Sequence, residues 1–203
     1  MNQSPDISKL DAIVLAGGES KRMGVAKATL PFGDTSLVGS AVAALRPVFR
    51  RVLVVTRDKD SLAGIDAEVL EDEWPQQGPL VGLARGLAHS DADWCFVTAC
   101  DMPFLQVAVI KEMAKRLTGC DAVIPEYEGR LQTLHAFYSR ACLPIAQGLL
   151  EEGTTSMRAL VSGCRVTKFS QDGFAHIPDG LRSFRDVDTA EEYRAALNDP
   201  PES

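Results

Sequence analysis

The chain has 203 residues, of which 45% are hydrophobic and 24% are charged, and its formal net charge at neutral pH is −7. This length suits one α/β domain, residues 1–203, that buries its core without disulfide or metal staples. The acidic balance argues against a nucleic-acid-binding surface, which needs a basic field, and no apolar run approaches the roughly 18 residues that span a bilayer.

Apolar runs alternate with longer amphipathic segments, which predicts strands alternating with helices. The expected strands are 11–16, 51–56, 67–71, 93–99, 121–125, 133–139, 164–169 and 184–187. The expected helices are 36–46, 79–90, 105–118, 141–152, 155–162 and 189–197. Because continuous apolar strands favour burial on both faces, this order predicts a three-layer α/β/α fold with a mostly parallel sheet. We expect an ordered core from about residue 9 to 197 and a disordered tail at 198–203.

The cysteines and the N-terminal segment indicate the compartment. The five cysteines are Cys95, Cys100, Cys120, Cys142 and Cys164. Their odd number and the lack of a C-x-x-C pair favour reduced thiols over a disulfide framework or a metal site. Residues 1–9 lack the basic region and apolar stretch of a signal peptide. We therefore expect a soluble, cytoplasmic protein without membrane or nucleic-acid partners.

The stretch after the first expected strand is the most informative part of the chain. Leu15 and Ala16 lead into Gly17-Gly18, and Arg22 and Lys27 follow. Adjacent glycines let a ligand approach the main chain, and the exposed N–H groups of such a loop form an anion-binding nest. The arginine fork and the lysine point charge could neutralise a polyphosphate. This pattern predicts a phosphate-binding loop; the alternative is an ordinary strand–turn–helix with solvated basic residues.

Two well-known phosphate loops do not fit this segment. The P-loop needs Gly-Lys-Ser/Thr, but Lys27 lies between Ala26 and Ala28. The dinucleotide fingerprint needs a second glycine where Glu19 stands. The loop therefore indicates another nucleotide chemistry.

Two acidic residues follow other expected strands. Ligands in open parallel sheets lie beyond the carboxyl ends of the strands, which places the glycine loop, Asp72 and Asp101 at one edge. Asp101 offers the hard oxygen ligand that Mg²⁺ needs, or else caps the segment that follows it. Asp72 could accept hydrogen bonds from N–H or hydroxyl groups of a ligand, or else is a solvated member of the acidic run 71–73.

Other polar residues carry weaker signals. Asp186 and Asp188 could add a metal ligand, although local turn and N-cap bonding explains them equally well. Gly78-Pro79 leads into a helix, with proline suited to the first turn and glycine allowing the backbone to face a flat base. His135 and three cations could face a bound ligand, with structural or solvated roles as the default. These cations are Arg130, Arg158 and Lys168.

Four motifs together carry a family resemblance. The segment Leu15-Ala16-Gly17-Gly18-x3-Arg22-Met23-Gly24-x2-Lys27 resembles the signature of small nucleotidyltransferases with a Rossmann-like nucleotide-diphospho-sugar transferase fold. The later motifs are Glu71-Asp72 with Gly78-Pro79-Leu80-Val81-Gly82, then Cys100-Asp101-Met102-Pro103-Phe104, then Asp186-Val187-Asp188-Thr189. With the first, they resemble the molybdenum cofactor guanylyltransferases, in family order from about residue 11 to 197.

The resemblance implies a reaction and a set of site residues. GMP would pass from GTP to the terminal phosphate of molybdopterin, giving molybdopterin guanine dinucleotide and pyrophosphate. Mg²⁺, or Mn²⁺, would bind Asp101, with Asp186 or Asp188 as a further ligand, although the family commonly has asparagine at these two positions. The implied catalytic residues are Arg22, Lys27 and Asp101. The implied nucleotide-binding residues are Leu15, Ala16, Gly17, Gly18, Lys27, Asp72, Gly78, Pro79 and Asp101.

The resemblance also bears on partners and on alternatives. We expect a monomer that meets other molybdenum cofactor assembly proteins and apo-molybdoenzymes. Gly17-Gly18 and Asp101-Met102-Pro103 resemble the guanylyl branch of the family. The cytidylyl branch usually has Ala-Ala-Gly and Asp-Gln-Pro at these positions. A related cytidylyl- or sugar-phosphate nucleotidyltransferase is the first alternative, and a non-catalytic nucleotide-binding module is the second.

Overall fold

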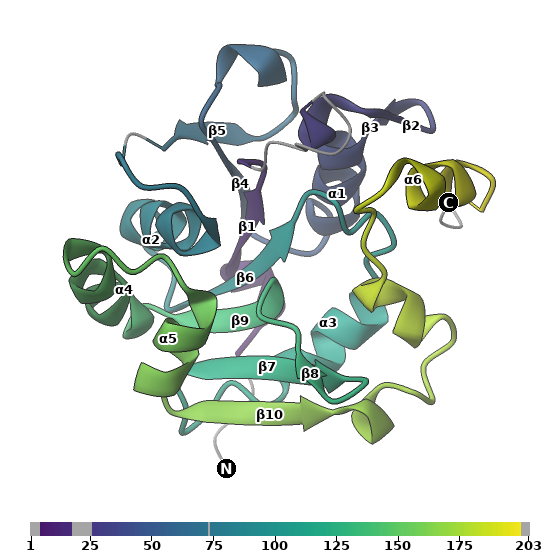
Figure 1. The fold of residues 1–203 in the computed structure, drawn as a ribbon. Coiled ribbons are helices and arrows are strands. Elements are labelled where there is room, and N and C mark those ends of the chain that lie inside the picture. Colours follow the sequence, from purple (N-terminus) through teal and green to yellow (C-terminus); the bar gives the residue numbers. More distant parts are fainter. Residues whose placement is uncertain (1–4, 18–25, 73, 200–203) are drawn as a thin grey trace.

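A computed structural model describes residues 5–17, 26–72 and 74–199 of the chain. The predicted site residues Gly18 and Arg22, and residues 200–203 of the expected tail, lie outside this part. A central sheet with helices on both faces forms three layers, as the sequence predicts (Figure 1). Asp199, the last residue described, forms an ion pair with Arg182 at 3.1 Å.

The main sheet is mostly parallel. Its strands are β1 (Asp11–Leu15), β4 (Arg51–Thr56), β5 (Glu68–Glu71), β6 (Trp94–Ala99), β7 (Ala122–Tyr127), β9 (His135–Ser139) and β10 (Val166–Ser170). They run in the order β10-β7-β9-β6-β1-β4-β5, and β9 is antiparallel to both of its neighbours. The short β8 (Arg130–Leu131) pairs with β7, while β2 (Pro31–Phe32) and β3 (Thr35–Ser36) form a separate hairpin.

The helices match the predicted ones, and most of them are a few residues shorter than predicted. They are α1 (Leu37–Leu45), α2 (Pro79–His89), α3 (Val107–Ala114), α4 (Cys142–Glu151), α5 (Met157–Gly163) and α6 (Ala190–Leu197). Short 3-10 turns are η1 (Ile7–Lys9), η2 (Lys27–Thr29), η3 (Asp60–Leu62), η4 (Gln171–Gly173) and η5 (Gly180–Phe184). Ser36 caps α1, and Thr189 with Glu192 forms a capping box on α6, as expected from the sequence. No helix of the described ranges is long and apolar enough to cross a membrane.

The expected strand at 184–187 is wrong. Phe184 ends the 3-10 turn η5, and its ring packs against Phe174 and Tyr127. Val187 instead joins a different cluster beside Phe104, and its N–H donates to the Asp101 carbonyl at 2.9 Å. The apolar residues of this segment are anchored one by one in separate clusters, so they do not alternate across a sheet.

The two faces of the sheet hold separate halves of the core. Alternate residues of β1 point in opposite directions, so that Ala12 and Val14 pack beneath α1 and α3. Ile13 and Leu15 pack beneath α2, on the face that α4 and α5 also cover. All four side chains are buried, which explains why the strand reads as a continuous apolar run.

A buried carboxylate fixes the amino end of β1. Asp11 has no exposed surface, and it accepts hydrogen bonds from Arg50 Nε at 2.9 Å, Arg51 Nη2 at 3.0 Å and Ser90 Oγ at 2.6 Å. Burial acts to raise the pKa of Asp11, but these hydrogen bonds outweigh burial and hold the pKa below its ordinary value. The interaction ties β1, β4 and the loop after α2 together at the edge of the sheet where β1 begins.

We expect Gly86→Ala to destabilise the fold. A Cβ at residue 86 of α2 would lie 2.6 Å from Cδ1 of Ile13, which is fully buried on β1. Overpacking of this kind costs about 1–3 kcal/mol in the free energy of unfolding, which urea denaturation would measure. Gly148→Ala in α4 is the matched control, because its Cβ meets nothing within 4 Å and alanine favours helix by up to about 1 kcal/mol. Equal stability changes in the two variants would contradict this packing argument.

Candidate nucleotide-binding site

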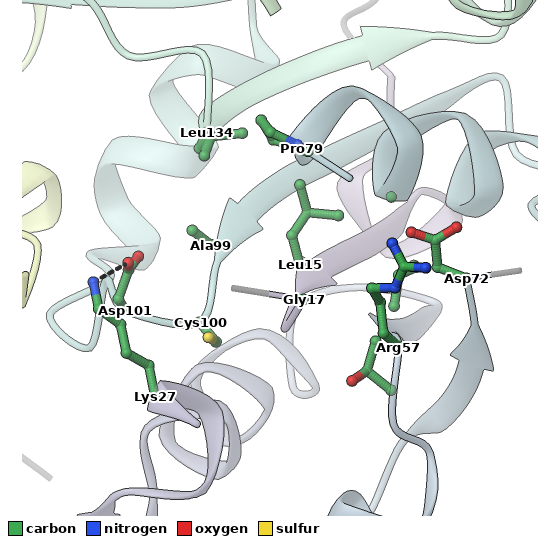
Figure 2. A pocket seen from close by; sticks show the side chains of 14 residues that line it. Leu15, Gly17, Lys27, Arg57, Asp72, Pro79, Ala99, Cys100, Asp101 and Leu134 are labelled. Carbon is green, nitrogen blue, oxygen red and sulfur yellow. Dashed lines mark hydrogen bonds and ion pairs between the residues drawn. The ribbon is translucent and has the colours of Figure 1, made fainter. Parts of the chain in front are cut away.

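A pocket opens at the carboxyl edge of the parallel strands (Figure 2). Gly17 follows β1, Asp72 follows β5 and Asp101 follows β6, so the three motifs that the sequence predicts at one edge line one pocket. Its lining residues are Leu15, Gly17, Lys27, Val55, Thr56, Arg57, Asp72, Gly78, Pro79, Gly82, Ala99, Cys100, Asp101 and Leu134. The predicted residue Ala16 is buried beside the pocket, and its N–H donates to the Val55 carbonyl at 2.8 Å.

Lys27 is the main cation that the described residues place at one end of this pocket. Its Nζ lies 3.1 Å from Asp101 Oδ2 and 2.5 Å from Asp188 Oδ1. Only 12% of the Lys27 side chain is exposed, so its ammonium depends on these carboxylates for solvation. Burial acts to lower the pKa of Lys27, but the hydrogen bond with Asp188 and the charge of Asp101 outweigh it and raise the pKa. Lys27 therefore stays charged at neutral pH.

Two aspartates contact this ammonium, and the charge of a third, Asp186, is coupled to both of them. Asp188 comes from the segment before α6, where its N–H donates to Glu192 Oε2 at 2.9 Å. Partial shielding from water raises the pKa of Asp186, and the charges of Asp188 and Asp101 raise it further. Burial is the larger cause of this shift, and the charges of the two neighbouring aspartates add to it in the same direction.

The donor set suits a hard divalent cation only in part. Asp101 and Asp188 present carboxylate oxygens to one positive charge, which is the ligand chemistry that Mg²⁺ prefers. The described residues form no cluster of three or more histidine, cysteine, aspartate or glutamate side chains arranged to hold a metal. The pair fits a magnesium ion that keeps other ligands, since Mg²⁺ commonly retains waters and binds phosphate oxygens.

The opposite end of the pocket is formed by Asp72 and Arg57. Asp72 Oδ1 accepts from the Trp74 N–H at 3.1 Å, and the Asp72 N–H donates to the Thr56 carbonyl at 2.7 Å. Arg57 donates to the carbonyls of Gln76 at 3.1 Å and Trp74 at 3.3 Å, and it lines the pocket together with Asp72 (Figure 2). Arg57 is not among the predicted site residues, although its place directly after the apolar run of β4 was a usable signal.

Glycines shape the wall that α2 contributes. Gly78 has φ of +142°, and a Cβ there would lie 3.0 Å from the Thr155 side chain. Gly82 faces Leu15, whose Cδ2 would be 2.9 Å from an added Cβ. Pro79 occupies the first turn of α2, as predicted. These positions bring the start of the helix close to β1 and leave backbone at the pocket wall.

The polar residues that the sequence offered as weaker ligand-binding candidates lie outside this pocket lining. Arg130 and Arg158 are exposed on β8 and α5, and Lys168 pairs with Glu126 at 3.1 Å. His135 is fully buried, with its ring between Phe96 and Phe184 and its Nε2 3.4 Å from Ser183 Oγ. The structural role that the sequence analysis gave as its default for His135 fits this position.

Known proteins share this sequence and architecture. The MobA-like NTP transferase domain family matches residues 12–168, which is more than half of the chain. A molybdenum cofactor guanylyltransferase from Desulfosudis oleivorans is 31% identical over 186 residues, covering 91% of this chain and 92% of its own length. The chain belongs to the MobA-like NTP transferase family, among the molybdenum cofactor guanylyltransferases. A probable molybdenum cofactor guanylyltransferase from Mycobacterium tuberculosis is 39% identical over 164 residues, covering 78% of this chain and 82% of its own length.

Solved structures agree at the level of the fold. A molybdopterin-guanine dinucleotide biosynthesis protein A from Archaeoglobus fulgidus superposes with a TM-score of 0.81 at 22% identity, covering 93% of this chain and 97% of its own. The 2-C-methyl-D-erythritol 4-phosphate cytidylyltransferase from Thermus thermophilus reaches a TM-score of 0.70 at 17% identity, covering 94% and 98%. The family assignment makes this chain a nucleotidyltransferase, and the predicted nucleotide-diphospho-sugar transferase type of fold is confirmed.

We expect His135 to make the fold sensitive to acid. Burial lowers the pKa of His135 to about 3, and its Nδ1 has no hydrogen-bond partner among the described residues. The unfolded chain takes up a proton near the ordinary pKa of about 6.5, so stability is complete above that pH and is lost as pH falls toward 3. His135→Leu should reduce the loss of unfolding free energy between pH 7 and pH 5 by about 2 kcal/mol. Exposed His176 supplies the control His176→Leu, and an unchanged loss in His135→Leu would contradict the assignment.

Proposed function

We propose that this protein transfers GMP from GTP to the terminal phosphate of molybdopterin, releasing pyrophosphate. The observation that carries the proposal is the meeting of Lys27, Asp101 and Asp188 at the end of a pocket that also contains Gly17 and Asp72. This arrangement supplies a charged group for phosphates at one end and a hydrogen-bonding carboxylate at the other. Family membership supports the same reaction.

The chemistry asks little of the protein beyond positioning and charge. A terminal phosphate is already ionised at neutral pH, so it needs no general base. One of its oxygens would attack the α-phosphorus of GTP in line, forming the new P–O bond as the bond to pyrophosphate breaks. Catalysis would then rest on holding the two phosphates together and on stabilising the charge that develops on the leaving group.

Lys27 is the residue we assign to the phosphates. Its ammonium is held at one end of the pocket by two carboxylates, and its raised pKa keeps it protonated. An incoming triphosphate offers oxygens that can replace a carboxylate as its partner. Backbone N–H groups of the loop that begins at Gly17 would add further donors, and the predicted catalytic residue Arg22 belongs to the same loop, outside the described residues.

Asp101 would hold Mg²⁺ or Mn²⁺, with Asp188 or Asp186 as the further carboxylate. A bound divalent ion would supply charge stabilisation on the transferring phosphates worth several kcal/mol. The contact of Asp101 and Asp188 with one ammonium supports a cation-binding role for these carboxylates.

The other end of the pocket is assigned to the base. The Asp72 carboxylate could accept hydrogen bonds from the N–H groups of guanine, or from ribose hydroxyls. The backbone of Gly78 and the ring of Pro79 would lie against a flat face of the nucleotide. We further propose that the chain acts as a monomer and exchanges molybdopterin with other cofactor assembly proteins and apo-molybdoenzymes.

Replacing the charged pair should abolish most turnover. We expect Lys27→Ala and Asp101→Ala each to lower turnover at least about a hundredfold, because each removes charge stabilisation that the transition state needs. The measurement is pyrophosphate release with GTP, Mg²⁺ and molybdopterin. Lys111→Ala on α3 and Asp172→Ala on η4 are the matched controls on the surface. Near-parental turnover in either site variant would remove that residue from the mechanism.

Asp72 should decide which nucleotide is preferred. We expect the parent protein to bind GTP with Mg²⁺ more tightly than ATP, CTP or UTP in calorimetry. Asp72→Asn, which exchanges an acceptor for a donor, should weaken GTP binding about tenfold or more and leave ATP binding little changed. Preference of the parent for CTP or UTP would move the assignment to a cytidylyl or sugar-nucleotide reaction. Equal losses for GTP and ATP would place Asp72 at the ribose instead of the base.

A further inference from the structure

Two cysteines that are far apart in the sequence lie in contact at the amino edge of the sheet, beside the residue that precedes β7. The Sγ atoms of Cys142 and Cys164 are 3.6 Å apart, in van der Waals contact. Cys142 is the first residue of α4 and is buried, whereas Cys164 directly follows α5 and is partly exposed. The pair therefore combines a protected thiol with one that a small oxidant can reach.

One residue holds both cysteines in place. The backbone carbonyl of Asp121 lies 3.2 Å from Cys142 Sγ. Its carboxylate binds Arg165, the neighbour of Cys164, through the backbone N–H at 2.9 Å and through Nη2 at 2.7 Å. The backbone next to Cys164 is thus bound to Asp121, the residue that Cys142 also contacts. These shared contacts with Asp121 bring the two thiols together.

The other cysteines are poorly suited to react with this pair. Burial raises the pKa of Cys95 and of Cys100 to about 12, which keeps both as thiols. Cys120 packs against the core cluster on the opposite face of the sheet from Cys142 and Cys164. Contact with Cys142 lowers the pKa of Cys164, so that the more accessible sulfur of the pair is also the one that ionises first.

We propose that Cys142 and Cys164 are a dithiol–disulfide pair, oxidised by thiol–disulfide exchange with a small disulfide such as glutathione disulfide. The Cys164 thiolate attacks one sulfur of the oxidant, forming a mixed disulfide and releasing one thiolate. Cys142 then loses its proton and attacks Cys164 Sγ, which expels the second thiolate. The protein loses two electrons and two protons, and the oxidant becomes two thiols. A bond needs an S–S distance of about 2.05 Å, so the sulfurs must approach by about 1.5 Å, within reach of rotamer adjustments.

The bond would close the segment that supports the pocket wall. The two cysteines are 22 positions apart, and the loop between them contains α4, the turn at 152–156 and α5. Thr155 in this turn is the residue against which Gly78 packs, with only 3.0 Å between its Cβ and one built at Gly78. Oxidation would therefore close a loop that includes the segment packed against the start of α2. Closing the loop lowers the conformational entropy of the unfolded chain, which stabilises the folded protein.

The test uses the full chain equilibrated in glutathione buffers of increasing oxidised fraction. Intact mass should fall by two hydrogen atoms, and peptide mapping should show one bond between the segments that hold Cys142 and Cys164. The melting temperature of the oxidised protein should exceed that of the reduced protein by roughly 5–10 °C. Cys120→Ser is the matched control and should form the bond as the parent does.

Variants make the proposal falsifiable. Cys164→Ser, at a partly exposed position, should remove both the mass change and the rise in melting temperature, and Cys142→Ala should stop the reaction at a glutathione adduct on Cys164. Thiols that stay free across the whole redox range would overturn the proposal. So would a parent protein that accumulates only the adduct, a bond that persists in Cys164→Ser, or a bond without any rise in melting temperature.

Discussion

The ammonium of Lys27 is the interaction on which the geometry of the site depends. It joins three parts of the chain that are remote in sequence: the turn η2, the loop after β6 that carries Asp101, and the segment before α6 that carries Asp188. Without a cation here, carboxylates from two of these segments would face each other. The position of the C-terminal segment is therefore coupled to the Lys27 end of the pocket through one side chain.

The placement of this site follows from the sheet. Parallel strands end at a common edge, so residues that directly follow β1, β5 and β6 meet there regardless of their separation in sequence. Gly17, Asp72 and Asp101 could be brought together from the sequence for that reason. The rule says which edge a residue reaches and says nothing about pairing, which is why the contact of Lys27 with both Asp101 and Asp188 emerged only from the structure.

What the sequence could not predict has identifiable physical causes. The apolar strands and the capping residues Ser36 and Thr189 act locally, so their patterns are readable. Phe184 and Val187 suggested a strand because a pattern cannot distinguish side chains sharing one face from side chains anchored in separate clusters. The antiparallel direction of β9 and the contact between Cys142 and Cys164 depend on how distant segments return to the sheet. Local residue patterns do not encode either.

The net negative charge of the protein opposes the binding of an anionic ligand at the site. Under the proposed function, a nucleoside triphosphate would approach a protein of net charge −7 and enter a pocket end where Asp101, Asp186 and Asp188 add negative charge of their own. Coulomb repulsion between these carboxylates and a triphosphate would be strong in a partly dehydrated site. Binding of the triphosphate would therefore require cations beside its phosphates. Lys27 compensates one charge and is already shared between two carboxylates. If the nucleotide binds here as we propose, the negative charge that Lys27 leaves uncompensated favours its entry together with a divalent cation, for which Asp101 and Asp188 would provide the carboxylates.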